Sequence, residues 1–600
     1  MYKRNGALLT GTFWQYLGPS LLSTTSILLG SIVDGIIVGN LIGPDAMSAV
    51  NLTQPVVLVV QALFFLFGMG AATAISIARG RREEAQANAL FTMGSLCLLA
   101  VSIAVAALGT VGIDGVVAVL CSNEALSGLA RSYASTIIVG APFMLVVPGL
   151  VYVIRVDGMP RMSAAVLVVA NVVNLVLDLV FIAVFGMGIA GAALATVVGY
   201  AAGGCIVLGY FVSKRRTLRF ASLGEPRKLL APIIDGGVAP ALNTCLLFAK
   251  ILLLNRIVLA VAGQGGMEIF AVCNYAISFV SIFVSGAAEA MVPLLGMLFG
   301  ERDARGMRIV FRRALLFVLI ACGVSIAAME LAPELILAAF SITDESRLAV
   351  GVVGLRVFGL SLFVMGANLI LMYYLQTVRR KSIAVAITVL RGFALVVPAA
   401  WLLSTQFGID GVWWAFVIAE AATLAVAVAA CLVVARRSHG ALEGVLLTEK
   451  PDDRVALFDG SLRATKTDAV GVSMEVIAFA RANGLDDAMA NTVGLMVEEA
   501  VVNIAETNAP CDRGRSASKA ADPVGVDVLV RIDPDEIRIA VRDGGVALDA
   551  LTAPRGSAEE FTGITVMRAM AERVEYARTL GLNDTLVLLS RDRKHAGCVS

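Results

Sequence analysis

The sequence predicts an all-α membrane protein of twelve transmembrane helices in two six-helix lobes, followed by a C-terminal α/β sandwich domain. Three observations support this fold class. Of the 600 residues, 58% are hydrophobic and 16% are charged, whereas soluble domains are roughly 45 to 50% apolar. The chain up to residue 436 contains two stretches that resemble each other. Near residue 453 the long apolar runs end and charged residues become frequent.

The apolar runs have the length of membrane spans. They recur from Phe13 to Val434, and about twelve of them contain the roughly 20 residues that a helix needs to cross a hydrocarbon core of about 30 Å. We therefore assign residues 1–436 to a membrane domain in contact with the lipid bilayer. The nine cysteines show no C-x-x-C spacing, and both histidines, His439 and His595, lie outside the runs. Neither a zinc site nor histidine catalysis within the membrane is supported.

The orientation of the spans follows from the basic residues in the loops. Lys and Arg collect in alternate loops, in RGRREE (79–84), SKRRTLR (213–219), ERDARGMRIVFRR (301–313) and RRK (379–381). The other loops contain little beyond Arg131 and Arg347. By the positive-inside rule, this asymmetry predicts a multi-pass protein of the cell membrane with both termini in the cytoplasm.

The membrane domain contains an internal repeat with an offset of about 220 residues. GMGIAGAALATVVGY (186–200) resembles FGIDGVWWAFVIAE (407–420), and GPSLL (18–22) resembles APALN (239–243). We place the two repeats at about 10–216 and 230–436. Two similar bundles around a central cavity suit alternating access, in which the halves rock about a fixed site.

Three polar residues in one apolar run are the first candidates for a site. Asn171, Asn174 and Asp178 stand at i, i+3 and i+7, on one face of a helix. An ionisable group inside a span costs roughly 2.5 to 3.5 kcal/mol and is a functional candidate by default. The alternative is that the amides only form hydrogen bonds between helices, and we favour this alternative for Asn171.

Several segments of the membrane domain resemble the MATE (multidrug and toxic compound extrusion) transporter family. They are SIVDGIIVGNLIGPDAMSAVNL (31–52), GMGAATAISIARGRREEA (68–85), NLVLDLVFIAVFGMGIAGAALAT (174–196) and GIDGVWWAFVIAEAAT (408–423). The resemblance implies twelve helices in two lobes and export of organic cations in exchange for protons or sodium ions. It also implies that the cation-coupling residues of the family correspond here to Asp34, Asn174 and Asp178.

The second repeat lacks this polar set. At the offset of about 220 residues, the three positions of the run are Arg391, Ala394 and Pro398, so the predicted coupling site lies in the first half only. Other charged residues in the spans are Lys250, Glu289, Arg391 and Glu420. We expect Arg391 to pair with Glu420, and Lys250 to pair or to snorkel. An ammonium group in the cavity would repel a cationic compound.

The C-terminal part is predicted to be a separate cytoplasmic domain. We assign residues 437–452 to a linker and 453–600 to this domain. VDVLVRIDPDEIRIAVRD (526–543) has the pattern of two strands joined by a polar turn. The domain contains no GxxxxGK[ST] sequence, which argues against a P-loop motor.

Three segments of this domain resemble the GHKL, or histidine kinase-like, ATPases, in particular the serine kinases related to anti-sigma factors. They are LMVEEAVVNIAETN (495–508), VRDGG (541–545) and TGITVMRAMAERVEY (562–576). The resemblance implies roles for Glu499 in orienting water or substrate, Asn503 in binding magnesium, Asp543 in binding adenine, and Gly545 and Gly563 in shaping the pocket.

Two departures from the GHKL pattern concern activity. Thr565 replaces a lid glycine, and Glu506 stands where a basic residue is usual. A missing positive charge removes a stabiliser of transferred phosphate. We therefore expect ATP and magnesium to bind, and leave open whether the domain hydrolyses ATP, phosphorylates a partner or only binds. A nucleotide-free interaction module is the alternative.

Together these patterns predict a proton- or sodium-coupled antiporter that exports drugs or other organic, mainly cationic, compounds across the cell membrane. Its cytoplasmic domain would respond to nucleotide or to a regulatory protein, and no nucleic-acid partner is expected. One alternative is a membrane-anchored serine kinase with a transporter-derived sensor. Another is a flippase for a lipid-linked precursor, which would need more basic residues in the spans than Lys250, Arg256 and Arg391.

Overall fold

The chain folds into a bundle of long helices and a separate mixed domain. The computed structural model describes residues 2–121, 124–340, 342, 344–450, 454–508, 523–547 and 567–591. They divide into two compact units, one of Phe13–Ser438 with Gly444–Thr448, and one of Met1–Thr12, His439–Glu443 and Glu449–Ser600.

The first half of the membrane unit contains nine α-helices and two π-helical segments within the described residues. They are α1 (Ala7–Leu41), α2 (Pro44–Phe64), η1 (Phe65–Met69), α3 (Gly70–Gly80), α4 (Glu84–Val111), α5 (Ile113–Leu120), α6 (Glu124–Val139), α7 (Ala141–Val156), α8 (Pro160–Asp178), η2 (Leu179–Val184) and α9 (Gly188–Val212). The α8 helix ends at Asp178, where the wider π-helical turn begins. Such π-bulges are frequent at functional sites.

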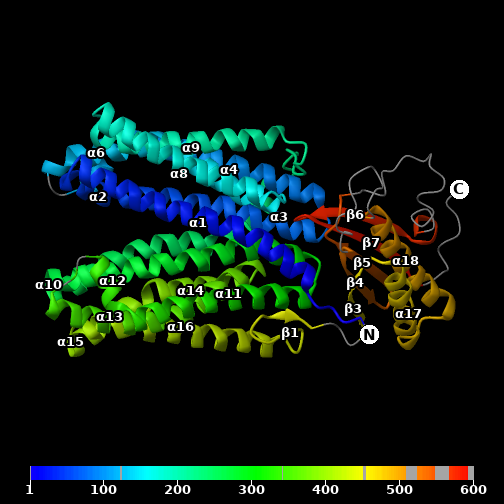
Figure 1. Ribbon diagram of the computed structural model, residues 1–600. Coiled ribbons are helices and arrows are strands. Elements are labelled where there is room, and N and C mark those ends of the chain that lie inside the picture. The colour runs from blue at the N-terminus through cyan, green and yellow to red at the C-terminus, as the bar shows by residue number, and fades with distance from the viewer. Residues whose placement is uncertain are drawn as a thin grey trace, which may run out of the picture. The chain divides into compact units, whose positions relative to one another are not determined.

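The second half contains seven α-helices and one π-helical segment in the part of the chain that the structure describes. They are α10 (Pro226–Gly300), α11 (Ala304–Leu331), α12 (Pro333–Ala339), α13 (Glu345–Thr377), α14 (Lys381–Val389), η3 (Leu390–Ala394), α15 (Val396–Phe407) and α16 (Ile409–Arg437). Figure 1 shows α2, α4, α6, α8 and α9 (blue to cyan) gathered on one side and α10–α16 (green to yellow) on the other.

These helices confirm the predicted multi-span membrane fold. Ten of the described helices are long and apolar enough to cross a membrane, or eleven if the bent pair of α6 and α7 forms one span. The α10 helix has 75 residues and a non-helical backbone at Gly263, with φ 60° and ψ −156°. Since about 20 helical residues suffice for one crossing, α10 has the length of two spans. The total of twelve stays a prediction.

The two halves touch closely where α3 passes α10. A Cβ atom on Gly237 would lie 2.0 Å from the carbonyl oxygen of Leu66, and one on Gly80 would lie 2.0 Å from that of Met297. Only glycine permits this approach of two backbones. Gly80 and Gly300 adjoin the basic loops 79–84 and 301–313, so the halves are in contact at the end of the bundle that carries these loops.

In the described residues of the C-terminal domain, a five-stranded antiparallel sheet packs against two long helices. The strands are β3 (Ala456–Arg463), β4 (Gly525–Ile532), β5 (Glu536–Asp543), β6 (Arg573–Thr579) and β7 (Leu582–Ser590), in the order β3-β4-β5-β7-β6, and the helices are α17 (Lys466–Ala482) and α18 (Asp487–Thr507). The linker holds the two-residue strands β1 (Leu442–Glu443) and β2 (Thr448–Glu449).

The core of this domain follows from strand alternation. Val526, Val528, Val530 and Ile532 of β4 are all buried, as expected for side chains that point to one face of a sheet. They pack with apolar residues of α17 and α18. The side chains of Thr465 and Asp486 cap the two helices by accepting hydrogen bonds from the third residue on. The predicted two-strand pattern at 526–543 is confirmed, with Val526 opposite Asp543.

The first residues of the chain belong to the same unit as this domain. The backbone N–H of Arg4 donates to the carbonyl of Asp459, a residue of the edge strand β3, at 3.2 Å. The Tyr2 hydroxyl donates to Asp468 Oδ1 at 3.1 Å, and Arg4 Nε donates to Asp527 Oδ2 at 3.2 Å. The α1 helix then begins at Ala7 and continues without interruption to Leu41.

Candidate functional site

Helices α1 and α8 run close together at the predicted coupling residues. A Cβ atom on Gly30 of α1 would lie 2.7 Å from Asn171 Oδ1 of α8. The Asn171 amide also donates to the carbonyl of Leu167, four residues back in its own helix, at 2.8 Å. One turn beyond Gly30 on α1 stands Asp34, and two turns beyond Asn171 on α8 stands Asp178.

Asp34 and Asp178 lie close enough to act electrostatically on each other. The Asp178 side chain is fully buried, and neither of its oxygens has a hydrogen-bond partner among the described residues. Two carboxylates cannot donate to each other, so a hydrogen bond between them requires a proton on one. The arrangement therefore suits a shared proton or a bound cation.

Asn174 completes the predicted set. It is 8% exposed, and its Nδ2 donates to Thr196 Oγ1 of α9 at 3.3 Å. This hydrogen bond commits the amide nitrogen and leaves the amide oxygen as the atom able to accept from a ligand or to bind a cation. Within the described residues, no group of three or more His, Cys, Asp or Glu could hold a metal ion.

Tyr133 of α6 is a neighbour that the sequence analysis missed. It is buried, and both Asp34 and Asp178 act electrostatically on its hydroxyl. A phenol can donate a hydrogen bond to a carboxylate or accept one from a carboxylic acid. The available signal was a tyrosine within the largely apolar stretch YASTIIVG (133–140).

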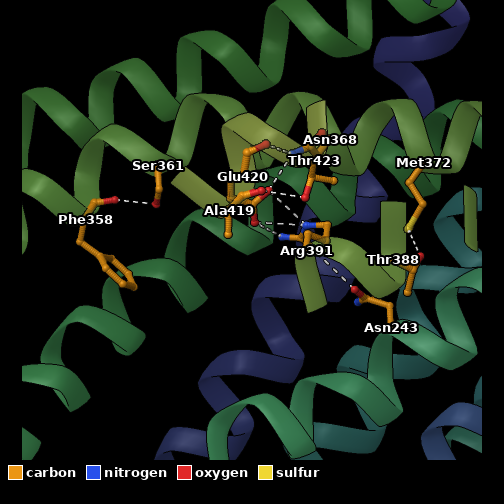
Figure 2. Close-up of polar contacts among 10 residues, drawn as sticks. All are labelled: Asn243, Phe358, Ser361, Asn368, Met372, Thr388, Arg391, Ala419, Glu420 and Thr423. Carbon is orange, nitrogen blue, oxygen red and sulfur yellow. Dashed lines mark hydrogen bonds and ion pairs between the residues drawn. The ribbon is translucent and has the colours of Figure 1, made fainter. Parts of the chain in front are cut away.

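The second half holds a different polar cluster (Figure 2). Arg391 of η3 contacts Glu420 of α16 through Nη2 to Oε1 at 3.0 Å and Nε to Oε1 at 3.2 Å. Asn368 of α13 donates to Glu420 Oε2 at 2.7 Å, and Arg391 Nη1 donates to Asn243 Oδ1 of α10 at 3.3 Å. Both charged side chains are at least nine-tenths buried. The predicted Arg391–Glu420 pair is confirmed.

Lys250 is a third charged residue of this cluster and lies beside the Arg391–Glu420 pair without bonding to either residue. Its Nζ is 5.9 Å from the centre of the Phe416 ring, one turn before Glu420 on α16. It forms no hydrogen bond or ion pair with the residues that the structure describes. The expected ion pair of Lys250 is therefore absent from the described part of the chain.

Glu289 joins the two halves of the bundle. Arg155 of α7 contacts Glu289 of α10 through Nη1 to Oε2 at 2.6 Å, and the Tyr152 hydroxyl donates to Glu289 Oε1 at 3.3 Å. These residues are more than 130 positions apart in the chain, and no local pattern relates them. This ion pair is a second contact between the two halves, in addition to the close approach of their backbones at the glycines.

The C-terminal domain brings several predicted nucleotide-site residues onto two neighbouring elements. Glu499 and Asn503 lie one turn apart on α18, and Asp543 ends β5. Asn503 Nδ2 is buried without a hydrogen-bond partner among the described residues, which fits a polar group that a ligand would satisfy. Partial burial and then the neighbouring Glu498 and Glu506 raise the pKa of Glu499.

Asp543 is held by a network of its own. Its Oδ1 accepts hydrogen bonds from the Gly545 N–H at 2.7 Å and from Asn583 Nδ2 at 2.9 Å. Burial raises the pKa of this carboxyl, and the two hydrogen bonds act in the opposite direction. Asn508 Oδ1 accepts from the Val546 N–H at 2.9 Å. Asn508 and Asn583 are supporting residues that the motifs did not identify.

Glu506 lies beside a basic residue. Its carboxylate lies 2.9 Å from Lys466 Nζ at the start of α17, and both side chains are at least half exposed. Gly563 and Thr565, the two predicted lid positions, lie outside the described residues.

Comparisons with known proteins agree with both parts of the chain. The family model described as MatE matches residues 19–180 and 240–402, and the model described as histidine kinase-like ATPase domain matches residues 462–589. Multidrug export protein MepA of Staphylococcus aureus is 26% identical over 423 residues, covering 69% of this chain and 91% of MepA. MepA of Staphylococcus haemolyticus is 23% identical over 403 residues, covering 67% and 88%.

Solved structures show the same fold. A transporter of the MOP superfamily from Pyrococcus furiosus has a TM-score of 0.65 at 21% identity, covering 71% of this chain and 97% of its own. An outward-facing multidrug resistance MATE family transporter has a TM-score of 0.65 at 19% identity, with coverages of 71% and 97%. Because the MatE model matches more than half of the residues, this chain belongs to the MatE family of multi-pass membrane transporters, and it also carries a histidine kinase-like ATPase domain.

Proposed function

We propose that the protein is a proton- or sodium-coupled antiporter that exports small organic compounds across the cell membrane, with both termini in the cytoplasm. The observation that carries the proposal is the juxtaposition of Asp34 and Asp178, since three of their four carboxylate oxygens are buried without a hydrogen-bond partner among the described residues. The name of the MepA relatives, multidrug export protein, supports export of drugs.

The carboxylate pair supplies a physical basis for coupling. Two charged carboxylates in contact repel each other, and one proton or sodium ion relieves this repulsion. A ligand shifts a two-state equilibrium only by its difference in affinity for the two states. An ion that stabilises the close approach of α1 and α8 therefore favours the conformation in which these helices are together.

Substitution of the carboxylates tests the coupling. Asp34→Asn and Asp178→Asn should each abolish dye efflux from proteoliposomes under an imposed proton or sodium gradient, because an amide does not exchange a proton. Asn171→Ala is the matched control, since Asn171 stands on the same face of α8 and bonds to its own helix backbone. Full gradient-driven efflux by either aspartate variant would refute the assignment.

We further propose that the C-terminal domain binds ATP and magnesium and regulates transport. Asn503 would contribute to the magnesium site, and Asp543 would accept a hydrogen bond from the adenine amine. The N-terminal segment supports a regulatory role, because residues 2–6 contact this domain while the same chain continues through α1 to Asp34. A conformational change in the domain thus has a short covalent route to the coupling site.

Titration of the full chain tests this second part. Calorimetry should detect ATP binding in the presence of magnesium, and Asn503→Ala should weaken it chiefly when magnesium is present. Absence of heat with millimolar ATP and magnesium would leave the interaction-module alternative. ATP-dependent phosphorylation of a partner, with no effect of ATP on efflux, would instead favour the serine-kinase alternative.

A further inference from the structure

The second half of the bundle contains a buried cluster with more positive than negative charge. Its charged members are Arg391, Glu420 and Lys250. Arg391 and Glu420 neutralise each other through two hydrogen bonds to Oε1, and Asn368 occupies Oε2. The one carboxylate of the cluster is therefore already paired, and the cluster retains the charge of Lys250.

The geometry places Lys250 on the side of α10 that faces the cluster. Asn243 and Lys250 are seven residues apart, which puts them on one face of the helix. Asn243 accepts a hydrogen bond from Arg391, and a Cβ atom on Gly392 would lie 3.2 Å from the Leu246 side chain. This face of α10 thus packs against η3, while the Phe416 ring of α16 lies 5.9 Å from Lys250 Nζ.

Snorkelling does not explain Lys250. The residue stands thirteen positions before the break at Gly263, about 20 Å along the helix axis at 1.5 Å per residue, and farther from Pro226. As a whole residue, Lys250 is partly buried. An ammonium inside a span is costly without a counter-charge, and a single aromatic face compensates for it only in part.

We propose that Lys250 binds an anionic group of the transported compound, so that this exporter accepts amphipathic compounds with a carboxylate, either zwitterions or anions. The inference rests on the proposed export function and names its substrate class. A carboxylate would pair with the ammonium, and the apolar body of the compound would contact the Phe416 side. One ammonium matches a singly charged group better than a pyrophosphate, whose recognition favours several basic residues.

A pair of dyes that differ at one group tests the proposal. One is a rhodamine with a free carboxylate, and the other is its methyl ester, which is a cation. Efflux of both is measured from proteoliposomes containing the wild-type chain, Lys250→Met or Lys250→Arg. Arg256→Met is the matched control, because Arg256 is an exposed cation on the same helix.

We expect Lys250→Met to reduce kcat/KM for the carboxylated dye about tenfold or more, corresponding to loss of roughly 1.4 kcal/mol, and to leave ester efflux unchanged or faster. Lys250→Arg should retain most of the carboxylated-dye efflux, and Arg256→Met should alter neither dye. Equal effects of Lys250→Met on both dyes would overturn the proposal while leaving the exporter function standing.

If the wild-type chain exports neither dye, the exporter proposal fails in this assay, and binding decides the inference separately. Fluorescence anisotropy of the carboxylated dye with the purified full chain should then show about tenfold weaker binding by Lys250→Met. Equal affinities of wild type and Lys250→Met, or binding of the ester alone, would overturn it.

Discussion

Arg4 offers the sharpest test of whether the N-terminal segment is an integral part of the C-terminal domain. Its guanidinium is fully buried, with Nε 3.2 Å from Asp527 Oδ2 and 3.7 Å from Asp459 Oδ1. The Asp527 side chain is only 1% exposed, and its other oxygen accepts from Ser461 Oγ at 2.6 Å. Arg4→Ala would leave the two carboxylates beside each other in the protein interior without this guanidinium.

The cost of this substitution can be estimated from the burial. Breaking a buried ion pair by removing one partner costs about 3–5 kcal/mol, because the remaining charge is uncompensated. For a unit of this size, 1 kcal/mol shifts the unfolding midpoint by about 2–4 °C. We therefore expect Arg4→Ala to lower the Tm of the C-terminal domain by on the order of 10 °C. Arg4→Lys should lower it less, since the charge remains but the forked geometry is lost.

Thermal unfolding of the purified full chain, followed by protease sensitivity of the C-terminal domain, measures the effect. Lys3→Ala is the matched control, because Lys3 is an exposed cation one residue away. If Arg4→Ala unfolds at the same temperature as Lys3→Ala, the N-terminal segment is not an integral part of the domain. The N-terminal segment would then provide no route from the domain to α1.

Two further predictions concern topology and the nucleotide site. A reporter that is active only outside the cytoplasm should be silent when fused after Ser600, and strong activity would contradict the basic-loop asymmetry. Asp543→Asn should weaken ATP binding by about 1–3 kcal/mol in calorimetry, because a donor would then face the adenine amine. Burial raises the pKa of Asp543 in the folded domain, so its contribution to stability is fully present below the unfolded-state pKa and is lost as pH rises through the folded-state pKa. The Tm of Asp543→Asn should depend less on pH in that window, and an unchanged pH profile would contradict the burial argument.

The local periodicity of the sequence was sufficient to predict the parts of the fold that depend on a single helix or on neighbouring strands. The spacing of Asn171, Asn174 and Asp178 predicted one face of one helix, and α8 contains all three. The alternation in residues 526–543 likewise predicted a pair of strands, which the register of β4 and β5 confirms. In both cases the side-chain direction follows from the backbone period, so a short window of sequence contains the information.

Contacts between distant segments could not be predicted in this way. Arg155 and Glu289 are 134 residues apart, and Arg4 and Asp527 are 523 apart. From the sequence alone, each of these residues would be interpreted as a charged residue in a loop or as a costly charge in a span. The Arg391–Glu420 pair could be predicted only because both residues lie on helices that were expected to be neighbours. For Lys250, the sequence could not show whether a counter-charge lies nearby, because this becomes known only when the position of every neighbouring carboxylate is known.

The proposed sites divide coupling and substrate recognition between the two halves of the repeat, and this division has a measurable consequence. Asp34 and Asp178 belong to α1 and α8, whereas Lys250 belongs to α10. If the two sites act separately, Asp178→Asn should lose gradient-driven efflux but still bind the carboxylated dye with an affinity that Lys250→Met reduces. Lys250→Met should, conversely, export the methyl ester at a rate that still depends on the imposed gradient. Loss of dye binding by a folded Asp178→Asn protein would mean that the two halves share one site, and the assignment of the anion to the second half would have to be abandoned.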